Sequence, residues 1–488
     1  MVPPLFYISL IDNFRFIRIF ATKTTGMLQR INLLVIFCLF TLPLMAEEID
    51  IHKIYEIGLP VVEIETLKGE WPTYEGVLPP QGASGYGIKN ATKVPGRLRI
   101  LKGKEVLYDS GEYLEDESGM TIRIRGNTTA WNKKKPYKIK LQKKADLLLR
   151  GDDDKYSDKE WLLILDESLS AKTGFKLNEL SGMQWTPAYE YANVIFNGRY
   201  MGVYMLCESV KRNKTCRLDV DKSGFIFEFD AYWWNEKVYV ESTLNRHPMH
   251  YTFKYPDTDD ITEEQIAYFT EMIHNMESSI KDGTYPEYID VDSFVTWILL
   301  HDILGNKDAG GSNFFLTKYD NTDQTKVVFA LLWDFDMIFI CKDEWSTTHG
   351  YGWFLYDALF RDNDFVQAFI SKWKEISPTV FDQLFDFLRS YASSEEATAL
   401  DESIILDNLL WNQNRVSVSE RTDGIISWLT YRKRWIDNAI VKMSGTNSLE
   451  AGTLIPDNEN TYYNLQGQSV HSLNRGIYLH NRKKVIVK

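Results

Sequence analysis

The sequence predicts an α+β protein with a β-rich first lobe, a mainly helical second lobe and a small β-patterned tail. Three observations predict this fold class. Short apolar runs punctuated by Gly and Pro, which are typical of strands, continue to about residue 230. Beyond that point, apolar residues recur at helical spacing. With 488 residues, of which 44% are hydrophobic and 14% aromatic, the chain is long enough to bury a large core.

Residues 1–46 are predicted to be a signal peptide. Arg30 precedes an apolar run over residues 31–45, and the run ends at Ala46 before two glutamates. It is shorter than a confident membrane span requires. The residues before Met27 differ from an ordinary signal sequence, so translation could begin at Met27. We therefore expect an exported protein, at the cell surface, in the periplasm or secreted, with no integral membrane span after signal removal.

Residues 47–230 form the predicted β-rich lobe. One of its runs alternates apolar and basic residues, as a half-buried strand does, which places Lys138 and Lys140 on one face. The dipeptide Asn197-Gly198 separates two other runs and is a strong hairpin signal. The strand-like runs are residues 98–101, 136–141, 191–196, 202–206 and 224–229.

Residues 231–443 form the predicted helical lobe. Asp290 or Asp292 can cap a helix that Gly305 ends. The apolar positions of this helix are Val291, Phe294, Val295, Ile298 and Ile303. The later elements are helices over residues 365–392 (broken near Pro378) and 425–443, a polar linker over 444–460 and the β-patterned tail over 461–488.

The overall charge excludes one class of function. A net charge of -13 and a pI near 5.3 argue against nucleic-acid binding, because the phosphate backbone requires a basic face. Cys207 and Cys216 could pair in an oxidising compartment, which would leave Cys341 over. These cysteines have no metal-ligand spacing and make no disulfide framework.

The chemistry is expected in residues 305–336. Asp308 and Asn313 have an Asp-x4-Asn spacing, and Asp334 follows a predicted hairpin. The spacing matches the catalytic loop of protein kinases, although Asn306 replaces its His and the Asp-Phe-Gly element reads Asp334-Phe335-Asp336. Phosphoryl transfer needs a carboxylate near the acceptor hydroxyl and oxygen ligands for magnesium. Each piece alone also fits a turn former or a helix cap.

The ordered set of motifs over about residues 55 to 443 resembles the CotH kinase-like family, first described among spore coat components. The motifs are Arg123-Ile124-Arg125-Gly126-Asn127-Thr128, Trp131, Lys135-Pro136-Tyr137-Lys138-Ile139-Lys140-Leu141, Lys159-Glu160-Trp161-Leu162-Leu163, Gly198-Arg199-Tyr200-Met201-Gly202-Val203-Tyr204, Glu208, Asp308 with Asn313, and Trp333-Asp334-Phe335-Asp336. This resemblance implies a two-lobed, protein-kinase-like fold. It also implies an atypical kinase that uses ATP with Mg²⁺, or Mn²⁺, and phosphorylates Ser in a protein partner.

The resemblance also implies roles for individual residues. Asp308 would be the catalytic carboxylate, with Asn313 and Asp334 as magnesium ligands and Asp336 assisting. A phosphate-binding lysine is expected on a strand of the first lobe, and the candidates are Lys140 and Lys138; both could instead be solvated.

Two further residues are candidates for the nucleotide site. Glu208 could pair with the phosphate-binding lysine or be an ordinary surface residue. Arg125, with the two residues after it, would form the turn that approaches the phosphates. The chain has no Gly-x-Gly-x-x-Gly loop to perform this task.

The tail resembles the carboxyl-terminal sorting tags of secreted proteins in some Gram-negative bacteria, which implies a contact with export machinery; a β domain without a targeting role is the alternative. The favoured function is an exported kinase acting on an unknown protein acceptor. The main alternative is a noncatalytic surface or adhesion protein with a kinase-like fold. A carbohydrate-active enzyme would need two carboxylates across a sugar-sized gap, which sequence does not reveal.

Overall fold

The computed structural model describes residues 49–83, 85–151, 154–166, 168–243, 249–309, 313–346 and 357–444, and the backbone of four short strands between 462 and 487. The chain divides into two compact units, Met1–Asp50 and Ile51–Lys488. The predicted signal peptide lies outside the described residues, as does the predicted linker apart from Ser444. Within the described part, no helix is both long and apolar enough to cross a membrane.

A large sheet in the first part of the chain closes on itself. Its strand order is β1-β9-β10-β8-β7-β6-β4-β5, and β1 also pairs with β4. All described pairings in this sheet are antiparallel except β1 with β9. The strands are β1 Val61–Thr66, β4 Val94–Lys102, β5 Glu105–Asp109, β6 Met120–Ile124, β7 Tyr137–Ala145, β8 Asp158–Ile164, β9 Tyr189–Phe196 and β10 Arg199–Glu208.

The two faces of this closed sheet differ because successive side chains of a strand point to opposite sides. Ile122, Ile139 and Trp161 belong to the cluster enclosed by the sheet. Leu162 and Cys207 belong to the larger cluster that the sheet shares with the second part of the chain. The outer face of the sheet is therefore the one that meets the rest of the protein.

The predicted hairpin and strands of the first part are confirmed. Asn197 and Gly198 have φ angles of 49° and 71°, which the tight turn between β9 and β10 requires. The run at 98–101 lies within β4, and the run at 136–141 lies within β7 except for Pro136, which precedes the strand. A short helix, α3 Ile51–Ile54, and a separate pair of strands, β2 Glu75–Val77 with β3 Gly87–Lys89, were not predicted.

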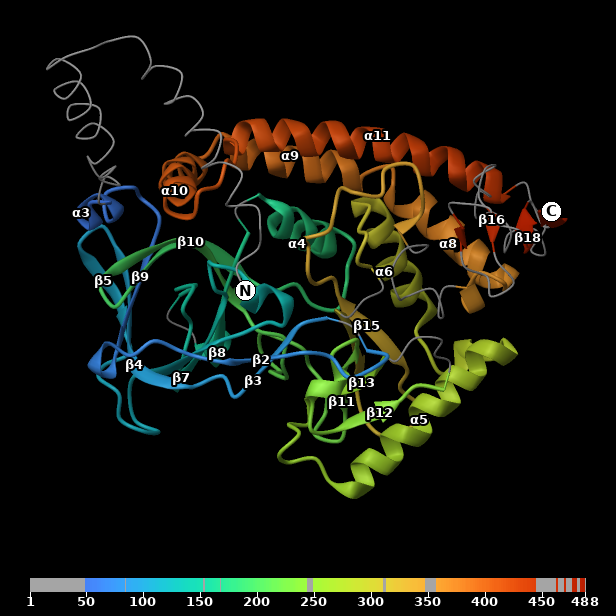
Figure 1. Cartoon of the computed structure of the whole chain (residues 1–488), viewed down its shortest axis with the longest axis horizontal. Helices are drawn as coiled ribbons and strands as arrows, with labels where there is room; N and C mark the ends of the chain where they lie inside the picture. Colours follow the sequence, from blue (N-terminus) through green and yellow to red (C-terminus); the bar gives the residue numbers. More distant parts are fainter. Residues whose placement is uncertain are drawn as a thin grey trace, which may run out of the picture. The chain divides into compact units, whose positions relative to one another are not determined.

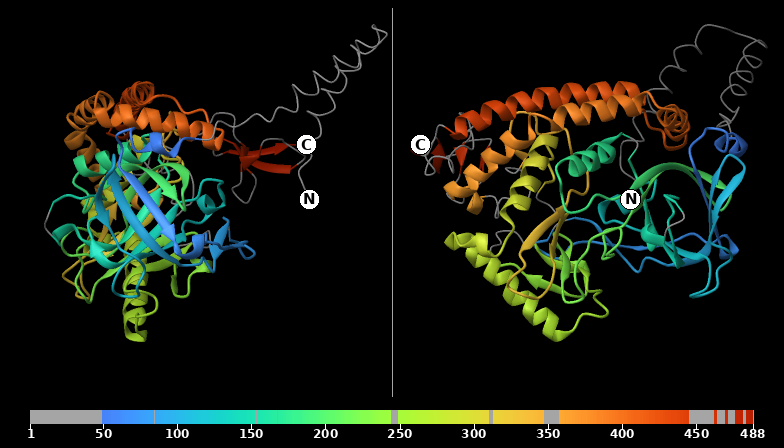
Figure 2. Two further views of the ribbon diagram at one scale, coloured as in Figure 1. Left: turned by 90° about the vertical axis from the view of Figure 1, so that its left-hand side faces the viewer. Right: turned by 180° about the vertical axis from the view of Figure 1, so that it is seen from behind.

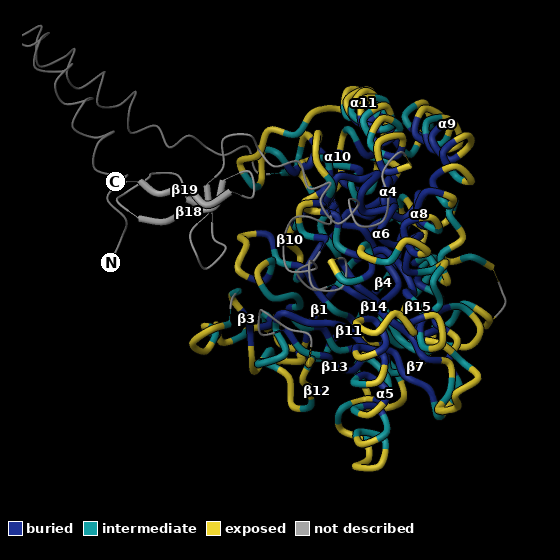
Figure 3. Tube along the Cα trace, turned by 90° about the vertical axis from the view of Figure 1, so that its right-hand side faces the viewer, coloured by how far each residue is buried: buried dark blue, intermediate teal, exposed yellow. Residues whose placement is uncertain are grey.

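A second sheet follows the first one along the chain and has five described strands. Its order is β12-β13-β11-β14-β15, with all described pairings antiparallel. Most of its residues are buried, as Figure 3 shows for β11, β14 and β15. The strands are β11 Phe225–Asp230, β12 Tyr239–Glu241, β13 His250–Tyr255, β14 Phe314–Lys318 and β15 Val327–Leu331.

Helices cover this sheet and link it to the first one. Helix α6 packs on β15 and contacts α4, α8 and α11, while α10 packs on β10 (Figure 1). Helices α9 and α11 lie side by side (Figure 2). The helices are α4 Ser170–Leu180, α5 Glu263–Asp282, α6 Val291–Leu304, α8 Asn363–Ile376, α9 Val380–Ala392, α10 Glu395–Trp411 and α11 Val418–Ser444.

The predicted caps of α6 are confirmed. The Asp290 side chain accepts a hydrogen bond from Ser293 N at 2.8 Å, and Gly305 ends the helix with φ 55°. The predicted break near Pro378 separates α8 from α9. Helices α4, α5 and α10 were not predicted.

A buried carboxylate fastens α10 to the first sheet. Asp407 accepts hydrogen bonds from Lys134 Nζ at 2.7 Å and from Val203 N at 3.0 Å, and it also pairs with Arg415. Gly202, next to it, has φ 95°, and a Cβ there would collide with Asp407 Oδ1. This close approach therefore requires glycine.

The tail contains four short strands that pair as an antiparallel sheet, in the order β17-β16-β18-β19. They are β16 Tyr462–Tyr463, β17 Ser469–Val470, β18 Gly476–His480 and β19 Lys483–Val487. The β pattern of the tail is thus seen in the backbone.

Candidate active site

The loop after α6 is fixed by one buried amide. Asn306 Oδ1 accepts a hydrogen bond from Asp308 N at 2.9 Å. Asn306 Nδ2 donates to the carbonyl oxygen of Asp334 at 3.4 Å and lies 3.2 Å from His301 Nδ1. Asn306, which stands where a kinase loop has His, thereby ties Asp308 to the end of β15.

The β14–β15 hairpin brings Asn313 and Asp334 together. Asn313 precedes β14 and Asp334 follows β15 closely, and Asn313 Nδ2 donates to Asp334 Oδ2 at 3.2 Å. Both residues have positive φ angles, 68° and 63°. Such angles are uncommon outside glycine and are frequent at functional sites. The structure therefore joins two of the residues that the sequence singled out.

Asp308 and Asp336 complete an acidic group around Asp334. Burial and the charge of Asp334 raise the pKa of Asp308 to about 7. The pKa of Asp336 rises to about 8, because of burial and because Asp334, Asp166 and Asp308 lie near it. Asp336 itself keeps an exposed surface. Negative charge is therefore concentrated here beyond what the neighbouring cations compensate.

Arg125 is the predicted nucleotide-site residue that lies close enough to this acidic group to sense its charge. Burial lowers the pKa of Arg125, and Asp334 is the neighbour whose charge opposes that effect most strongly. Arg125 directly follows β6, so it reaches the group from the first sheet. A guanidinium in this position can contact a phosphate group bound beside Asp334.

Tyr232 is a neighbour of the acidic group that the sequence did not reveal. Its hydroxyl lies 2.7 Å from the hydroxyl of Thr128, in the turn after Arg125. Burial and the negative charges of Asp308, Asp230 and Asp334 raise its pKa. Tyr232 therefore links the turn after β6 to the carboxylates of the second part.

Lys138 and Lys140 lie on the outer face of β7, farther along the sheet. Lys138 forms an ion pair with Glu160 at 2.7 Å, and burial lowers its pKa. Lys140 is exposed and lies opposite Glu160 in the ladder. Among the described residues, neither lysine forms a hydrogen bond or ion pair with Asp308, Asn313 or Asp334.

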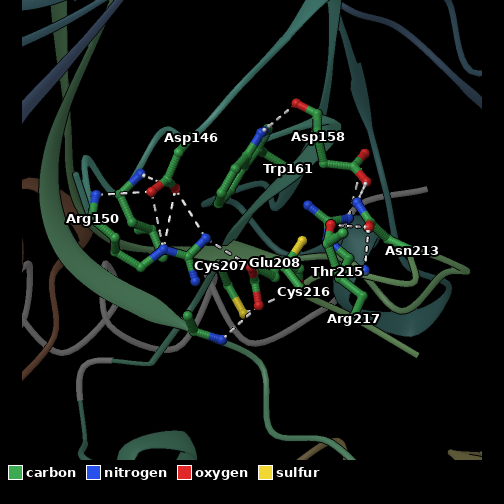
Figure 4. Close-up of polar contacts among 12 residues, drawn as sticks. Asp146, Arg150, Asp158, Trp161, Cys207, Glu208, Asn213, Thr215, Cys216 and Arg217 are labelled. Atoms are coloured by element: carbon green, nitrogen blue, oxygen red, sulfur yellow. Dashed lines mark hydrogen bonds and ion pairs between the residues drawn. The ribbon is translucent and has the colours of Figure 1, made fainter. Parts of the chain in front are cut away.

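Glu208 fits neither sequence alternative, because its cationic partner is Arg150 rather than one of these lysines and the residue is buried rather than on the surface. Glu208 accepts hydrogen bonds from Arg150 Nη2 and from Ala188 N, both at 2.9 Å (Figure 4). Glu208 is the last residue of β10 and is 1% exposed, and the β7–β8 connection supplies its cation. Burial raises the pKa of Glu208, and Arg150 counteracts that rise.

The possible disulfide between Cys207 and Cys216 is not formed in the structure. Both cysteines are free, and so is Cys341. The Cys207 thiol donates to the carbonyl oxygen of Glu208 at 3.3 Å, and burial raises its pKa (Figure 4). Cys207 is therefore a packed residue of the sheet rather than a redox centre.

Glu228 is a second residue that sequence analysis missed. It lies on β11, accepts a hydrogen bond from Asn313 N at 3.0 Å and forms an ion pair with Lys254 at 2.9 Å. The signal was present in β11, which reads Phe-Ile-Phe-Glu-Phe-Asp and is buried throughout. An acidic residue in such a strand requires a partner, because burying an unpaired charge is costly.

The oxygen donors of the site suit magnesium bound together with phosphate. Among the described residues, no three His, Cys, Asp or Glu side chains are arranged to hold a metal ion by themselves. Mg²⁺ ordinarily takes one or two carboxylates plus substrate phosphates and keeps several waters. Asp334, Asp336 and the amide oxygen of Asn313 supply this smaller set. The raised pKa of Asp336 also fits a place where a cation would stabilise the ionised form.

Comparison with known protein families shows to which family the chain belongs. A family model described as CotH kinase protein matches residues 122–436, which is more than half of the sequence. The chain belongs to the CotH kinase family. The resemblance seen in the sequence is thereby confirmed, and membership indicates an atypical kinase that uses ATP. A search of curated proteins gives no match.

The CotH match coincides with the candidate site. It begins in β6, three residues before Arg125, and ends within α11. Asp308, Asn313 and Asp334 all lie inside it. The N-terminal apolar run and the C-terminal tail lie outside, so the family assignment concerns the sheets and helices that build the site.

Proposed function

We propose that the protein is an exported atypical protein kinase that transfers phosphate from ATP, with Mg²⁺, to a hydroxyl of a protein, with Ser as the acceptor residue. The observation that carries this proposal is the contact between Asn313 and Asp334 beside Asp308. Membership of the CotH kinase family supports it. The succession of a closed sheet and a helical part fits a two-lobed, kinase-like fold.

The arrangement supplies the groups that phosphoryl transfer needs. Asn313, Asp334 and Asp336 would hold Mg²⁺, which when bound neutralises charge on the phosphates of ATP. Arg125, which directly follows β6, would contact those phosphates from the first sheet. Lys138 and Lys140, farther along β7, remain candidates for a contact with the nucleotide phosphates.

Asp308 acts on the acceptor. Its carboxylate takes the proton of the serine hydroxyl while the serine oxygen bonds to the γ-phosphorus and the bond from that phosphorus to the bridging oxygen of ADP breaks. A carboxylate with a pKa near 7 suits this task, because a general base works best near the ambient pH. The Asn306 side-chain oxygen holds Asp308 in position by accepting a hydrogen bond from the main-chain N–H of Asp308.

A phosphate-transfer assay tests the proposal. The protein lacking residues 1–46 would be incubated with radiolabelled ATP and Mg²⁺ or Mn²⁺, alone and with candidate acceptors, followed by phosphoamino acid analysis. We expect phosphoserine with wild type and none with Asp308→Asn. Asp320→Asn, in the exposed β14–β15 turn, is the matched control and should label like wild type. Equal labelling by wild type and Asp308→Asn would refute the catalytic role.

A noncatalytic surface protein is the second candidate function. The lack of a glycine-rich phosphate loop and the export-type N-terminal run favour it. Titration calorimetry with Mg²⁺-ATP separates the two functions. Binding that Asp334→Asn abolishes supports the kinase, whereas no binding supports the surface protein.

A further inference from the structure

Four neighbouring strands of the second sheet, together with the residues that flank them, contribute one side chain each to a continuous series of contacts. The sheet order β13-β11-β14-β15 places Lys254, Glu228, Asn313 and Asp334 in that sequence across the sheet. Lys254 Nζ contacts Glu228 Oε2 at 2.9 Å, Asn313 N donates to Glu228 Oε1 at 3.0 Å, and Asn313 Nδ2 donates to Asp334 Oδ2 at 3.2 Å. The candidate metal site therefore continues into the sheet.

The first contact of this series, between Lys254 and Glu228, involves a β-bulge at Lys254. Phe227 pairs with Phe253, but the preceding residue, Ile226, pairs with Tyr255, so Lys254 is an extra residue in β13. Bulges redirect a side chain and are frequent next to active sites. The bulge lets Lys254 reach the carboxylate of Glu228, which is only 7% exposed.

Glu228 uses both of its oxygens on donors. One oxygen accepts a hydrogen bond from the main-chain N–H of Asn313. The φ angle of Asn313 is 68°, a backbone conformation that residues other than glycine rarely adopt. The other oxygen faces the Lys254 ammonium group. Burial lowers the pKa of a lysine, but the charges of Glu228, Glu236 and Asp230 outweigh this and raise that of Lys254. Lys254 is therefore a firmly charged partner.

We propose that the Glu228–Lys254 pair is a positioning device for the metal site, which holds Asn313 in the conformation that turns its amide to Asp334. This inference rests on the proposed function of Asn313 as a metal ligand. Groups that orient the ligands of a metal typically change metal affinity about 10- to 100-fold when they are mutated. Glu228 and Lys254 touch neither substrate nor metal in this account.

The isosteric variant Glu228→Gln tests the pair because glutamine has only one accepting oxygen. Asn313 N and Lys254 Nζ are both donors, so the amide group of glutamine must face one of them with its own NH₂. Lys254→Met removes the cation, and Lys254→Arg restores it. Glu277→Gln is the matched control, since Glu277 is equally buried and accepts from Ser242, Thr243 and Tyr251, none of which belongs to the site.

The measurement is the affinity for Mn²⁺ in the presence of a nonhydrolysable ATP analogue, read from the electron paramagnetic resonance of free Mn²⁺, with full-chain protein lacking only residues 1–46. We expect Glu228→Gln and Lys254→Met to weaken Mn²⁺ binding about 10-fold or more. Lys254→Arg and Glu277→Gln should bind like wild type. Affinity for the analogue in EDTA should stay unchanged in all four variants.

The double variant Glu228→Gln/Asn313→Ala tests whether Glu228 affects Mn²⁺ binding through Asn313. If Glu228 acts through Asn313, the double variant should bind Mn²⁺ no more weakly than Asn313→Ala alone, because coupled residues are non-additive. Unaltered Mn²⁺ affinity in Glu228→Gln and Lys254→Met would overturn the positioning role while leaving the proposed function intact. A wild type that binds no Mn²⁺ with the analogue would overturn both.

Discussion

Asn313 donates its side-chain amide to Asp334 across 3.2 Å, although 21 positions separate the two residues in the chain. Their contact follows from the β14–β15 hairpin, which returns the chain to the same end of the sheet. Asp308 reaches the same place because α6 ends at Gly305 and Asn306 anchors the next turn. Metal binding, nucleotide binding and stability should therefore depend on this junction and on the contacts that support it.

Relieving the acidic group should stabilise the metal-free protein at high pH. The pKa of Asp308 is about 7 when folded and 3.8 in the reference state, so the folded state binds more protons between these values and stability falls as pH rises through this range. At pH 8 in EDTA, Asp308→Asn should therefore unfold at a higher temperature than wild type. Its free energy of unfolding should be higher by on the order of 2 kcal/mol. Thermal scans at pH 4 and pH 8 measure this effect. A difference that does not grow with pH would contradict it.

His301 should make stability depend on pH in the opposite sense. Burial lowers its pKa from 6.5 to about 3, so the unfolded state binds the extra proton between these values. Its contribution is complete above pH 6.5 and is lost as pH falls, by at most about 1.4 kcal/mol per pH unit. Because the raised pKa values of Asp308 and Asp336 act in the other direction, the comparison must be between wild type and His301→Asn. Denaturant unfolding from pH 4 to 7 should show a shallower acid-side loss in the variant; parallel curves would exclude the effect.

The Asp407 contacts should contribute more to stability than a surface ion pair does. Lys134→Met leaves the fully buried Asp407 with less compensation and should lower the free energy of unfolding by about 3 kcal/mol. Lys237→Met removes an ion pair whose side chains are 73% and 71% exposed, and should leave the free energy of unfolding almost unchanged because solvent screens exposed charges. Urea unfolding of both variants provides the comparison. Equal effects would mean that Asp407 does not fasten α10 to β10.

Nucleotide affinity should depend on Arg125 more than on Lys138 or Lys140. Arg125 lies close enough to Asp334 to sense its charge, whereas Lys138 is paired with Glu160 and Lys140 is exposed. Calorimetry with Mg²⁺-ATP should show about a 10-fold or greater loss for Arg125→Gln, equivalent to about 1.4 kcal/mol. Lys140→Gln should have the smallest effect. A reversed order would place the phosphates along β7 instead.

Local patterns predicted the elements around the site well. Asp290 and Gly305 mark the ends of α6 because capping is a property of a few adjacent residues. The Asn197-Gly198 turn is equally local. In contrast, α4 contains Gly174 and alternates polar with apolar residues irregularly, so its helix depends on packing against α6 and α9. The closure of the first sheet through β1 and β4 is a long-range pairing that no local pattern encodes.

In the candidate site too, local features could be predicted from the sequence, whereas long-range contacts could not. The order of Asp308, Asn313 and Asp334 was readable because a loop and one hairpin connect them. The partner of Glu208 was not, since Arg150 comes from a connection 58 positions away, and the lysines on β7 were a plausible substitute. Lys254 was not recognisable either, because its contact with Glu228 depends on a one-residue bulge.

Diffraction from crystals soaked with Mn²⁺ and a nonhydrolysable ATP analogue tests the central claim most directly. We expect an anomalous peak for Mn²⁺ within bonding distance of Asp334 and the Asn313 amide oxygen, with the analogue phosphates reaching Arg125. The terminal phosphate should lie near Asp308. Mn²⁺ and nucleotide bound at another place, away from Asp334 and the Asn313 amide oxygen, would contradict it.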